Sequence, residues 1–356
     1  MPVPTSTCNL PTSLSFPARF VIPQLGNFLE AHIPHMANPH HIAARDDIYE
    51  WYTKFPIYEN EKHRAAFLQQ SRFDVMAALS FPHATEFQLG ACLIFYLWSF
   101  VVDDIADEGV CQEDTEAFVR LTKICMEVLN DTEGTMKRSN DPYVEMLQDL
   151  LARMRTTGSE GMLRRFTQGF NDWSSSQITQ SQQRSNGELP RVRKFLTERR
   201  NTFGIGMACA LIEYTMDIDL PDFIFKDPTV VEMTEAMFDV TIWANDLCSF
   251  NKEQAQGDYQ NLIPILMQEY RLDLQSAISK LTEMVRQRLD RYYHLKAQLH
   301  PIYGGLEISG ELVRYLEGLE VANVGVTKWY YQSPRYFRDV DASQGSFVEV
   351  ELFEHR

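Results

Sequence analysis

Residues 93–108 read LIFYLWSFVVDDIADE, an apolar run that ends in four acidic residues within six positions. The apolar part has the spacing of a buried helix, and this spacing extends back to about residue 84. Negative charge is unfavourable at the C-terminal end of a helix, because the helix dipole opposes it there. Either a solvated helix end or a metal site would account for these acids, and the rest of the chain must distinguish the two.

The remainder of the chain is also patterned as helices. Its 356 residues are 44% hydrophobic with only 17 Gly and 16 Pro, which argues against a loop-rich β architecture. The only strand signal, VEVEL at 348–352, stands alone. Apolar periodicity predicts helices over 40–54, 61–79, 84–104, 112–130, 142–155, 160–182, 190–214, 229–252, 261–268, 272–299 and 309–331.

The breaks between these segments are short, and none reads as an interdomain linker. We therefore expect an all-α fold with a single helical domain over residues 21–338. Residues 1–20 form a peripheral N-terminal segment in this prediction, and residues 339–356 form a C-terminal tail.

Charge and composition limit the partners. A net charge of −16 repels nucleic acid and anionic membrane surfaces. The longest apolar run, Leu89 to Val102, is too short for a membrane span, which needs about 20 residues. The N-terminus does not resemble a signal peptide, and the six scattered cysteines form no CxxC pair. We expect a cytoplasmic protein with no nucleic-acid partner and no membrane insertion.

The acidic end of the predicted helix 84–104 contains a possible metal-binding pair. Asp103 and Asp107 are four residues apart and share a face, whereas Asp104 is rotated by about 100°. Mg²⁺ prefers oxygen ligands and would offset the repulsion between the two carboxylates. A similar pattern, DDIYE at 46–50, falls in the first half of the predicted helix 40–54, where acids suit the dipole. The pattern is therefore weak evidence unless a second set of ligands exists.

A second set of ligands occurs in FDVTIWANDLCSFNKE at 238–253. Asn245, Ser249 and Glu253 are spaced i, i+4 and i+8, so they form one stripe about 12 Å long on a helix. An amide oxygen, a hydroxyl and a carboxylate are plausible ligands for a hard cation. The alternative is an ordinary polar stripe, although Asn and Ser are poor residues in the middle of a helix. Lys252 adjoins the stripe and would contact an anion held by the metals.

The two motifs together resemble those of class I terpene cyclases of the microbial type, over about residues 50–340. D-D-x-x-D at 103–107 and N-D-x-x-S-x-x-x-E at 245–253 match the family's two motifs. The resemblance implies the helical bundle of class I terpenoid synthases. It also implies that Asp103, Asp107, Asn245, Ser249 and Glu253 bind three Mg²⁺ ions together with a prenyl diphosphate.

The same resemblance suggests roles for basic residues. Arg335 and Tyr336, in WYYQSPRYF at 329–337, resemble the Arg-Tyr pair that hydrogen-bonds the diphosphate in this family. Arg199, in RRNTFG at 199–204, resembles the diphosphate sensor and lies 46 positions before Asn245 (245 − 199 = 46). Arg200 is the weaker candidate for that role. Gly204 and Gly206 indicate a helix break, which in the family exposes a backbone carbonyl to the cavity.

The chemistry implied is the breaking of an allylic C–O bond. Mg²⁺ and cationic donors stabilise the departing diphosphate, and apolar and aromatic walls protect the carbocation from water. Phe100 and Tyr96 share a face with Asp103, and Trp329 precedes Arg335 by six residues. We expect Phe100 and Trp329 to line the cavity and Phe203 to contribute, with ordinary core packing as the alternative.

Two other functions stay open at this point. A chain-elongating prenyltransferase would share the fold and the metals, but it normally has a second aspartate-rich motif where this chain has Asn245, Ser249 and Glu253. A non-catalytic helical scaffold would need neither polar stripe. The size of the chain resembles sesquiterpene synthases, which favours farnesyl diphosphate over geranyl or geranylgeranyl diphosphate. The sequence leaves a monomer and a homodimer open.

Overall fold

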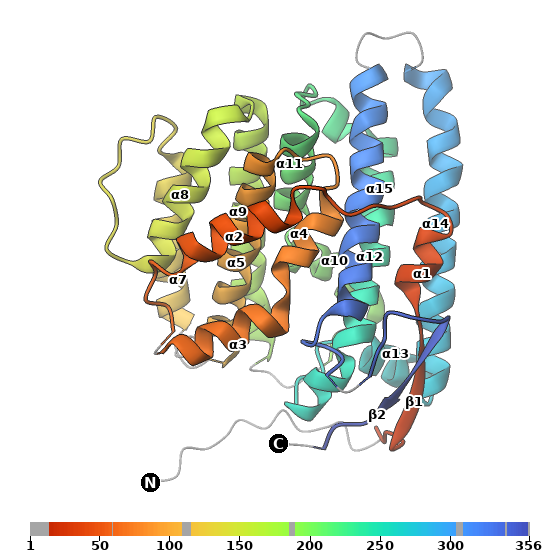
Figure 1. Cartoon of the computed structure of the whole chain (residues 1–356). Coiled ribbons are helices and arrows are strands. Elements are labelled where there is room, and N and C mark those ends of the chain that lie inside the picture. Colours follow the sequence, from red (N-terminus) through yellow and green to blue (C-terminus); the bar gives the residue numbers. More distant parts are fainter. Residues whose placement is uncertain are drawn as a thin grey trace.

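The computed structural model describes residues 14–58, 60–108, 115–184, 189–303, 309–338 and 340–354. These residues form a bundle of helices with a small two-stranded sheet at its lower edge, as drawn in Figure 1. The predicted all-α architecture is therefore confirmed. In chain order the elements are β1 (Arg19–Pro23), α1 (Leu25–Glu30), α2 (His41–Tyr52), α3 (Glu61–Ser71), α4 (Phe73–Ser80), α5 (Glu86–Glu108), α7 (Thr115–Asn130), α8 (Pro142–Thr157), α9 (Glu160–Arg184), α10 (Val192–Thr202), α11 (Ile205–Met216), the 3-10 helix η1 (Ile224–Lys226), α12 (Pro228–Ala255), α13 (Leu262–Tyr270), α14 (Leu274–Tyr303), α15 (Ser309–Gln332) and β2 (Phe347–Glu351).

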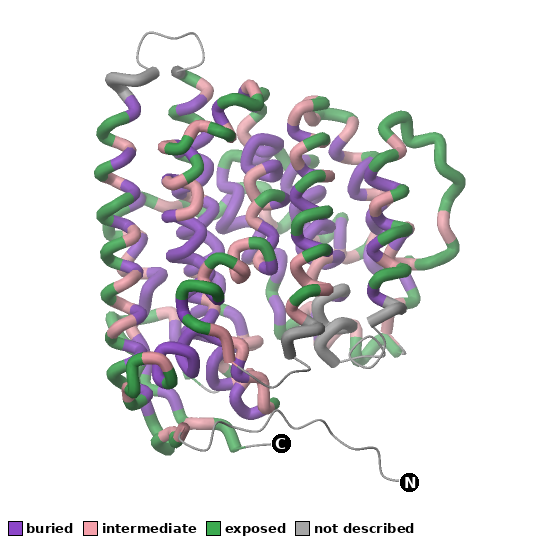
Figure 2. The backbone as a smooth tube through the Cα atoms, turned by 180° about the vertical axis from the view of Figure 1, so that it is seen from behind, coloured by how far each residue is buried: buried purple, intermediate pink, exposed green. Residues whose placement is uncertain are grey.

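Contacts between helices define the packing of the bundle. Helix α12 packs against α14 and α15, α4 packs on α15, and α5 packs against α2 and α8. Buried positions lie on the faces that the helices turn toward one another, whereas exposed positions follow their outer sides (Figure 2). No helix in the described part of the chain is long and apolar enough to cross a membrane.

Side-chain caps explain where several helices begin. Asp141 precedes α8 and Asp227 precedes α12, and each aspartate accepts hydrogen bonds from two backbone N–H groups of the first turn. A proline follows each aspartate at the first helical position, where its missing N–H is not needed. Asn261 caps α13 in the same manner by accepting from the Ile263 N–H. These caps fix the start of the helix that carries the second polar stripe and the start of the helix that follows it.

Two segments that the sequence predicts as continuous helices are each divided in two. The predicted helix 61–79 is wrong because Arg72 adopts a left-handed conformation (φ 50°) between α3 and α4. The ion pair between Arg72 and the buried Asp74, which also accepts from the His41 ring, helps to offset the strain at this position. The predicted helix 190–214 is broken at Phe203 and Gly204, as the glycines indicate, and Gly204 has a φ of 78°.

Gly206 explains how tightly the second half of that segment packs. A Cβ atom at Gly206 would lie 2.7 Å from the Cα atom of Gly169, so α11 and α9 approach each other at the two glycines. Any larger residue at either position would push the helices apart. The break and the glycine contact together hold α10 and α11 against the inner side of α9.

The C-terminal strand does not stand alone, contrary to the sequence prediction. Strand β2 pairs antiparallel with β1, with Arg19 opposite Glu351 and Pro23 opposite Phe347. The end of this strand is bound to α12: the Asn251 Nδ2 donates to the Glu351 carbonyl at 2.8 Å, and the Gln254 Nε2 donates to the Phe353 carbonyl at 2.8 Å. The first and last described segments of the chain therefore lie against the helix of the second polar stripe.

Candidate active site

The predicted stripe on α12 lies where that helix is almost entirely inside the molecule. Ser249 is 4% exposed, while Asn245 and Glu253 are partly buried. The long apolar stretch before them is buried on several faces, which forces this part of α12 into the core. A helix with such an environment presents polar side chains only toward another polar group or toward a ligand.

Arg199 of α10 is held against the first residues of this stripe. Its Nη2 donates to the Asn245 Oδ1 at 3.0 Å and to the Asp246 Oδ1 at 2.9 Å, and its Nε also donates to that aspartate oxygen, at 3.1 Å. Asp246 is 1% exposed, and burial raises the pKa of its carboxyl while Arg199 opposes the rise. The ion pair fixes the guanidinium beside Asn245.

Arg200 points to a different partner. Its Nε and Nη2 donate to the two oxygens of Asp239, both at 2.8 Å, and its Nη1 donates to Glu235 at 2.6 Å. Arg288 also pairs with Asp239, at 2.7 Å. Adjacent arginines on α10 therefore have separate contacts, and Arg199 is the one beside the polar stripe.

Glu253, at the other end of the stripe, has one described hydrogen-bond donor. The Asn261 Nδ2 donates to its Oε2 at 2.9 Å. Burial, followed by repulsion from Asp258 and Asp246, raises the pKa of Glu253 to about 7. Glu253 therefore lies near two other carboxylates, those of Asp258 and Asp246, and near the guanidinium of Arg199, and a further cation would be favoured there. The oxygens of Asn245, Ser249 and Glu253 are ligands of the type that Mg²⁺ takes, so these residues fit the predicted ion.

The segment after α15 brings Tyr336 to the same stripe. The Asn245 Nδ2 donates to the Tyr336 hydroxyl at 3.3 Å. Backbone carbonyls at the end of α3 hold this segment and the last turn of α15 in place: the Arg335 N–H donates to the Gln70 carbonyl at 3.1 Å, and the indole N–H of Trp329, in α15, donates to the Ser71 carbonyl at 2.8 Å. The last turn of α3 thus satisfies its free carbonyls with the segment that carries the predicted Arg-Tyr pair.

Phe100 connects the segment after α15 to α5, the helix that carries the first acidic motif. The Arg335 guanidinium carbon lies 5.4 Å from the centre of the Phe100 ring, and the Trp329 ring lies 5.9 Å from it. Trp329 also contacts the Tyr336 ring edge to face at 5.7 Å. Phe100, near the last described side chain of α5, therefore adjoins Arg335 and Trp329, while Tyr336 contacts Trp329 and α12.

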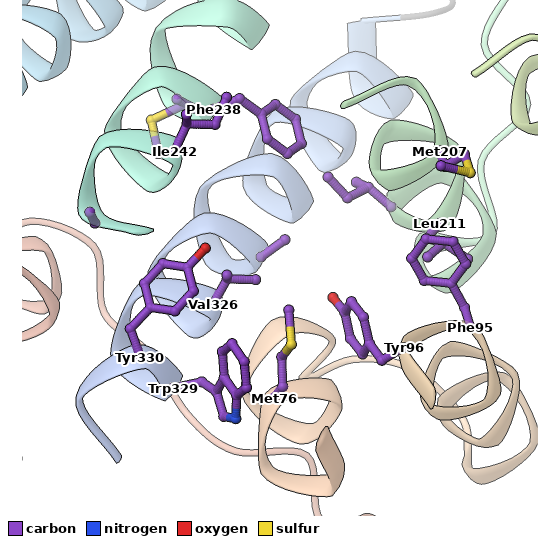
Figure 3. Close-up of a cluster of buried hydrophobic side chains, with 14 of the residues drawn as sticks. Met76, Phe95, Tyr96, Met207, Leu211, Phe238, Ile242, Val326, Trp329 and Tyr330 are labelled. Carbon is purple, nitrogen blue, oxygen red and sulfur yellow. The ribbon is translucent and has the colours of Figure 1, made fainter. Parts of the chain in front are cut away.

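An apolar wall adjoins these polar groups. Figure 3 shows side chains from α4, α5, α11, α12 and α15 pointing toward one another, with Trp329 and Tyr330 of α15 opposite Tyr96 of α5. All ten labelled side chains are buried: Met76, Phe95, Tyr96, Met207, Leu211, Phe238, Ile242, Val326, Trp329 and Tyr330. Trp329 is completely buried, and Phe100 is half-buried beside it. The polar stripe on α12 is therefore continuous with an aromatic interior.

For the other predicted site residues the structure gives fewer details of the side chains. The backbone of α5 continues to Glu108, but the side chains of Asp103 and Asp107 lie outside the described part of the structure. Lys252 is partly buried on α12, and its contact with an anion stays a prediction. Phe203 lies at the break between α10 and α11, packed against the core. Among the described side chains, no group of three or more His, Cys, Asp or Glu residues could hold a metal.

Arg199 also borders a pocket of about 420 Å³ between α9 and α10. Ser175, Ser176 and Thr179 of α9 line its other side. A second pocket of about 580 Å³, between α1 and the segment 340–344, contains none of the predicted site residues in its lining. The pocket beside α10 is thus the one of these two that has a predicted site residue, Arg199, in its lining.

Two residues of the site were not assigned a role from the sequence. Asp246 belongs to the second motif, but its spacing does not reveal that it fixes Arg199. Asn261 occupies the capping position before an apolar run, which signals the start of a helix. The sequence gives no sign that the same amide reaches back to Glu253.

The described geometry defines the class of protein. A helical bundle that places an N-D-x-x-S-x-x-x-E helix beside a paired arginine, a tyrosine and an aromatic interior is that of a class I terpene synthase. A family model described as terpene synthase family 2, C-terminal metal binding, matches residues 95–291. The chain belongs to this family, and it is a lyase that acts on a prenyl diphosphate.

Several relatives are similar over most of their length. Sesquiterpene synthase 2 of Postia placenta is 30% identical over 92% of this chain and 93% of that protein. The α-muurolene synthase of Coprinopsis cinerea is 28% identical over 94% of this chain and 78% of its own length. The Δ(6)-protoilludene synthase of Stereum hirsutum is 27% identical over 85% of this chain and 80% of its own length.

Solved structures have the same fold. A linalool/nerolidol synthase from Streptomyces clavuligerus superimposes with a TM-score of 0.72 and 23% identity, covering 83% of this chain and 98% of that one. A single-residue variant of cucumene synthase superimposes with a TM-score of 0.73 and 22% identity, covering 85% of this chain and 98% of that one. At this level of identity the likeness establishes the architecture of the bundle.

Proposed function

We propose that this protein catalyses the Mg²⁺-dependent ionisation and cyclisation of farnesyl diphosphate to a sesquiterpene, with release of diphosphate. The observation that carries the proposal is the convergence of Arg199 and Tyr336 on Asn245, at the end of an aromatic interior. The relatives named above as sesquiterpene synthases support a fifteen-carbon substrate.

The reaction begins when the allylic C–O bond breaks and its electron pair goes to the diphosphate oxygen. Arg199 would donate hydrogen bonds to the developing negative charge, as would Tyr336, and Arg335 and Lys252 would add positive charge. These groups belong to α10, α12 and the segment after α15, so substrate would draw three parts of the chain together. Ionisation in their absence would be slow.

Mg²⁺, bound by Asn245, Ser249 and Glu253 and by Asp103 and Asp107, would supply most of the charge that neutralises the leaving group. Three ions are proposed, by resemblance to the family. The polar stripe meets the requirements of the site because it offers oxygen ligands in a region with more carboxylates than cations.

The carbocation would then react within the aromatic interior. Phe100, Trp329 and Tyr96 would exclude water and present ring faces to the positive charge, and Phe203 would add to the wall near Arg199. The chain folds over its own double bonds, and the reaction ends when a carbon loses a proton or captures water. The contour of the wall selects the product.

Incubation of the purified protein with farnesyl diphosphate and Mg²⁺, followed by gas chromatography with mass spectrometry, tests the proposal. A sesquiterpene hydrocarbon or alcohol is the expected product, and geranyl and geranylgeranyl diphosphate in parallel define the chain length. Adding isopentenyl diphosphate examines the alternative of a chain-elongating prenyltransferase. Formation of longer diphosphates in place of terpenes would overturn the cyclase assignment.

A further inference from the structure

The side chain of Asn261 makes more contacts than a helix cap requires. It is 1% exposed, and its Oδ1 accepts from the Ile263 N–H at 2.9 Å, which caps α13. Its Nδ2 donates to the Glu253 Oε2 at 2.9 Å and to the Asp246 backbone carbonyl at 2.7 Å. It also lies 3.5 Å from the Ser249 hydroxyl. One amide thus links the start of α13 to Glu253 and Ser249 of the polar stripe and to the backbone of Asp246.

Capping alone does not explain an asparagine here. Serine or aspartate would cap α13 about as well, because only an oxygen acceptor is needed. The amide adds a donor, which aspartate lacks and which serine is too short to extend to Glu253. The residue type therefore matches the contact with the stripe.

The charge of the donor matters for a metal ligand. A lysine or arginine at this position would orient Glu253 but would also neutralise it and compete with a cation. A neutral amide holds one carboxylate oxygen and leaves the negative charge and the other oxygen available. The backbone beside it assists, since the Leu262 N–H donates to the Asp246 Oδ2 at 3.2 Å. The first two residues of this turn thereby fix Glu253 on one side and the partner of Arg199 on the other.

We propose that Asn261 is a positioning residue that holds Glu253 in line with Asn245 and Ser249 and so sets the affinity of this stripe for Mg²⁺. It acts through Glu253 and needs no contact with substrate or metal. A glutamate that is already restrained loses less rotamer freedom when it binds an ion. The inference rests on the proposed metal-binding role of the stripe.

The test compares Asn261→Ser with a matched control, Asn38→Ser. Asn38 is also buried, donates from its Nδ2 to two backbone carbonyls (Phe81 at 2.7 Å and Ala84 at 2.8 Å) and accepts from the His40 N–H at 2.8 Å. It contacts no residue of the stripe in these bonds. The two substitutions remove the same kind of amide, so a general loss of stability affects both variants.

Two measurements are made on each full-length protein. Calorimetric titration with Mg²⁺ in the presence of inorganic diphosphate gives metal affinity, and the Mg²⁺ dependence of turnover gives the kinetic counterpart. We expect Asn261→Ser to weaken Mg²⁺ binding by about 10-fold to 100-fold, the usual effect of losing a partner of a metal ligand. Turnover at saturating Mg²⁺ should recover most of its value. Asn38→Ser should lower Tm and leave the Mg²⁺ dependence unchanged.

Asn261→Thr, which keeps a capping oxygen and more of the side-chain volume, provides a second variant if the serine variant is poorly folded. An unchanged Mg²⁺ affinity in a folded Asn261 variant would overturn the inference, as would equal shifts in the Asn261 and Asn38 variants. Wild-type protein that binds no Mg²⁺ with diphosphate would also overturn it. If the wild type binds Mg²⁺ but forms no terpene, the proposed function fails, and the calorimetric comparison still decides the role of Asn261.

Discussion

Asn245 and Tyr336 are 91 residues apart, and a hydrogen bond of 3.3 Å from the Asn245 Nδ2 to the Tyr336 hydroxyl joins them. The same asparagine accepts from Arg199 through its Oδ1, at 3.0 Å. Both polar atoms of this amide are therefore occupied by the two groups proposed to contact the diphosphate. In the proposed mechanism, binding of the Asn245 oxygen to a metal would free Arg199 to turn toward the substrate, so this one residue would couple metal binding to the positions of the donors.

Replacement of Tyr336 by phenylalanine tests this coupling. We expect kcat with farnesyl diphosphate to fall about tenfold, because a hydrogen bond to a developing charge is lost while the ring keeps its packing against Trp329. Steady-state kinetics provide the measurement. Tyr331→Phe is the control, since the Tyr331 hydroxyl donates to the Pro23 carbonyl at 2.7 Å and interacts on α12 with the Cys248 thiol, which is not one of the proposed ligands. Equal losses of kcat in the two variants would contradict a specific role for Tyr336.

The adjacent arginines of α10 should differ sharply in their effects. Arg199→Lys keeps a positive charge but loses the fork that joins Asn245 and Asp246, and we expect kcat to fall about 100-fold. Arg200→Lys weakens the pair with Asp239 and should lower Tm with little effect on kcat. Kinetics and thermal unfolding of both variants distinguish these results. The roles assigned to the two residues would be reversed if the Arg200 variant lost turnover and the Arg199 variant did not.

Much of this architecture can be predicted from the sequence, because the apolar periodicity of each helix lies within its own residues. Apolar periodicity predicts helices close to α8 and α12, and i, i+4 and i+8 spacing predicts the stripe on α12. Local patterns do not extend to contacts between distant segments. The pairing of β1 with β2 joins residues more than 300 positions apart, and neither strand alone is long enough to identify its partner.

The missed features depend on tertiary contacts. Arginine is not a residue type that predicts a left-handed conformation, so the sequence does not reveal the one at Arg72. The contact between Arg72 and Asp74 depends on how α3 and α4 meet in the folded chain. Asn261 is visible as a helix cap, but its second contact exists only because the turn after α12 brings it back to Glu253. Sequence patterns thus find the ligands, whereas the residues that hold the ligands in place emerge only from the folded chain.

Phe100 should influence which product forms. Its ring lies between Phe73, at 4.4 Å, and the Arg335 guanidinium, at 5.4 Å. Phe100→Leu removes a ring face that would stabilise a carbocation and leaves extra space, so we expect a larger share of acyclic or hydroxylated products. Phe87→Leu is the control, because Phe87 lies on the same helix with 39% exposure. Gas chromatography of the product mixtures should show a change for Phe100 alone, and identical mixtures would remove Phe100 from the cavity wall.

Glu213 should make the stability of the protein depend on pH. It is completely buried on α11, and burial raises the pKa of its carboxyl to about 7, although Arg165 of α9 donates to both of its oxygens. A carboxyl with a raised pKa in the folded state favours folding most when it is protonated in both states. Its contribution to the free energy of unfolding is therefore fully present below pH 4.5, the ordinary value, and is lost as the pH rises toward 7.

Urea unfolding between pH 4.5 and pH 7 measures this contribution. Glu213→Gln cannot titrate, so we expect the decline in stability across this interval to be smaller than in the wild type. Asp222→Asn is the control: Asp222 also pairs with Arg165, at 2.6 Å, but a hydrogen bond from Arg164 helps to lower the pKa of its carboxyl below 3.8. The aspartate is ionised throughout the interval, so its removal should leave the decline intact. A Glu213→Gln variant with the wild-type pH dependence would mean that Arg165 keeps the buried glutamate ionised and that the contact between α9 and α11 is a charged one at every pH in this range.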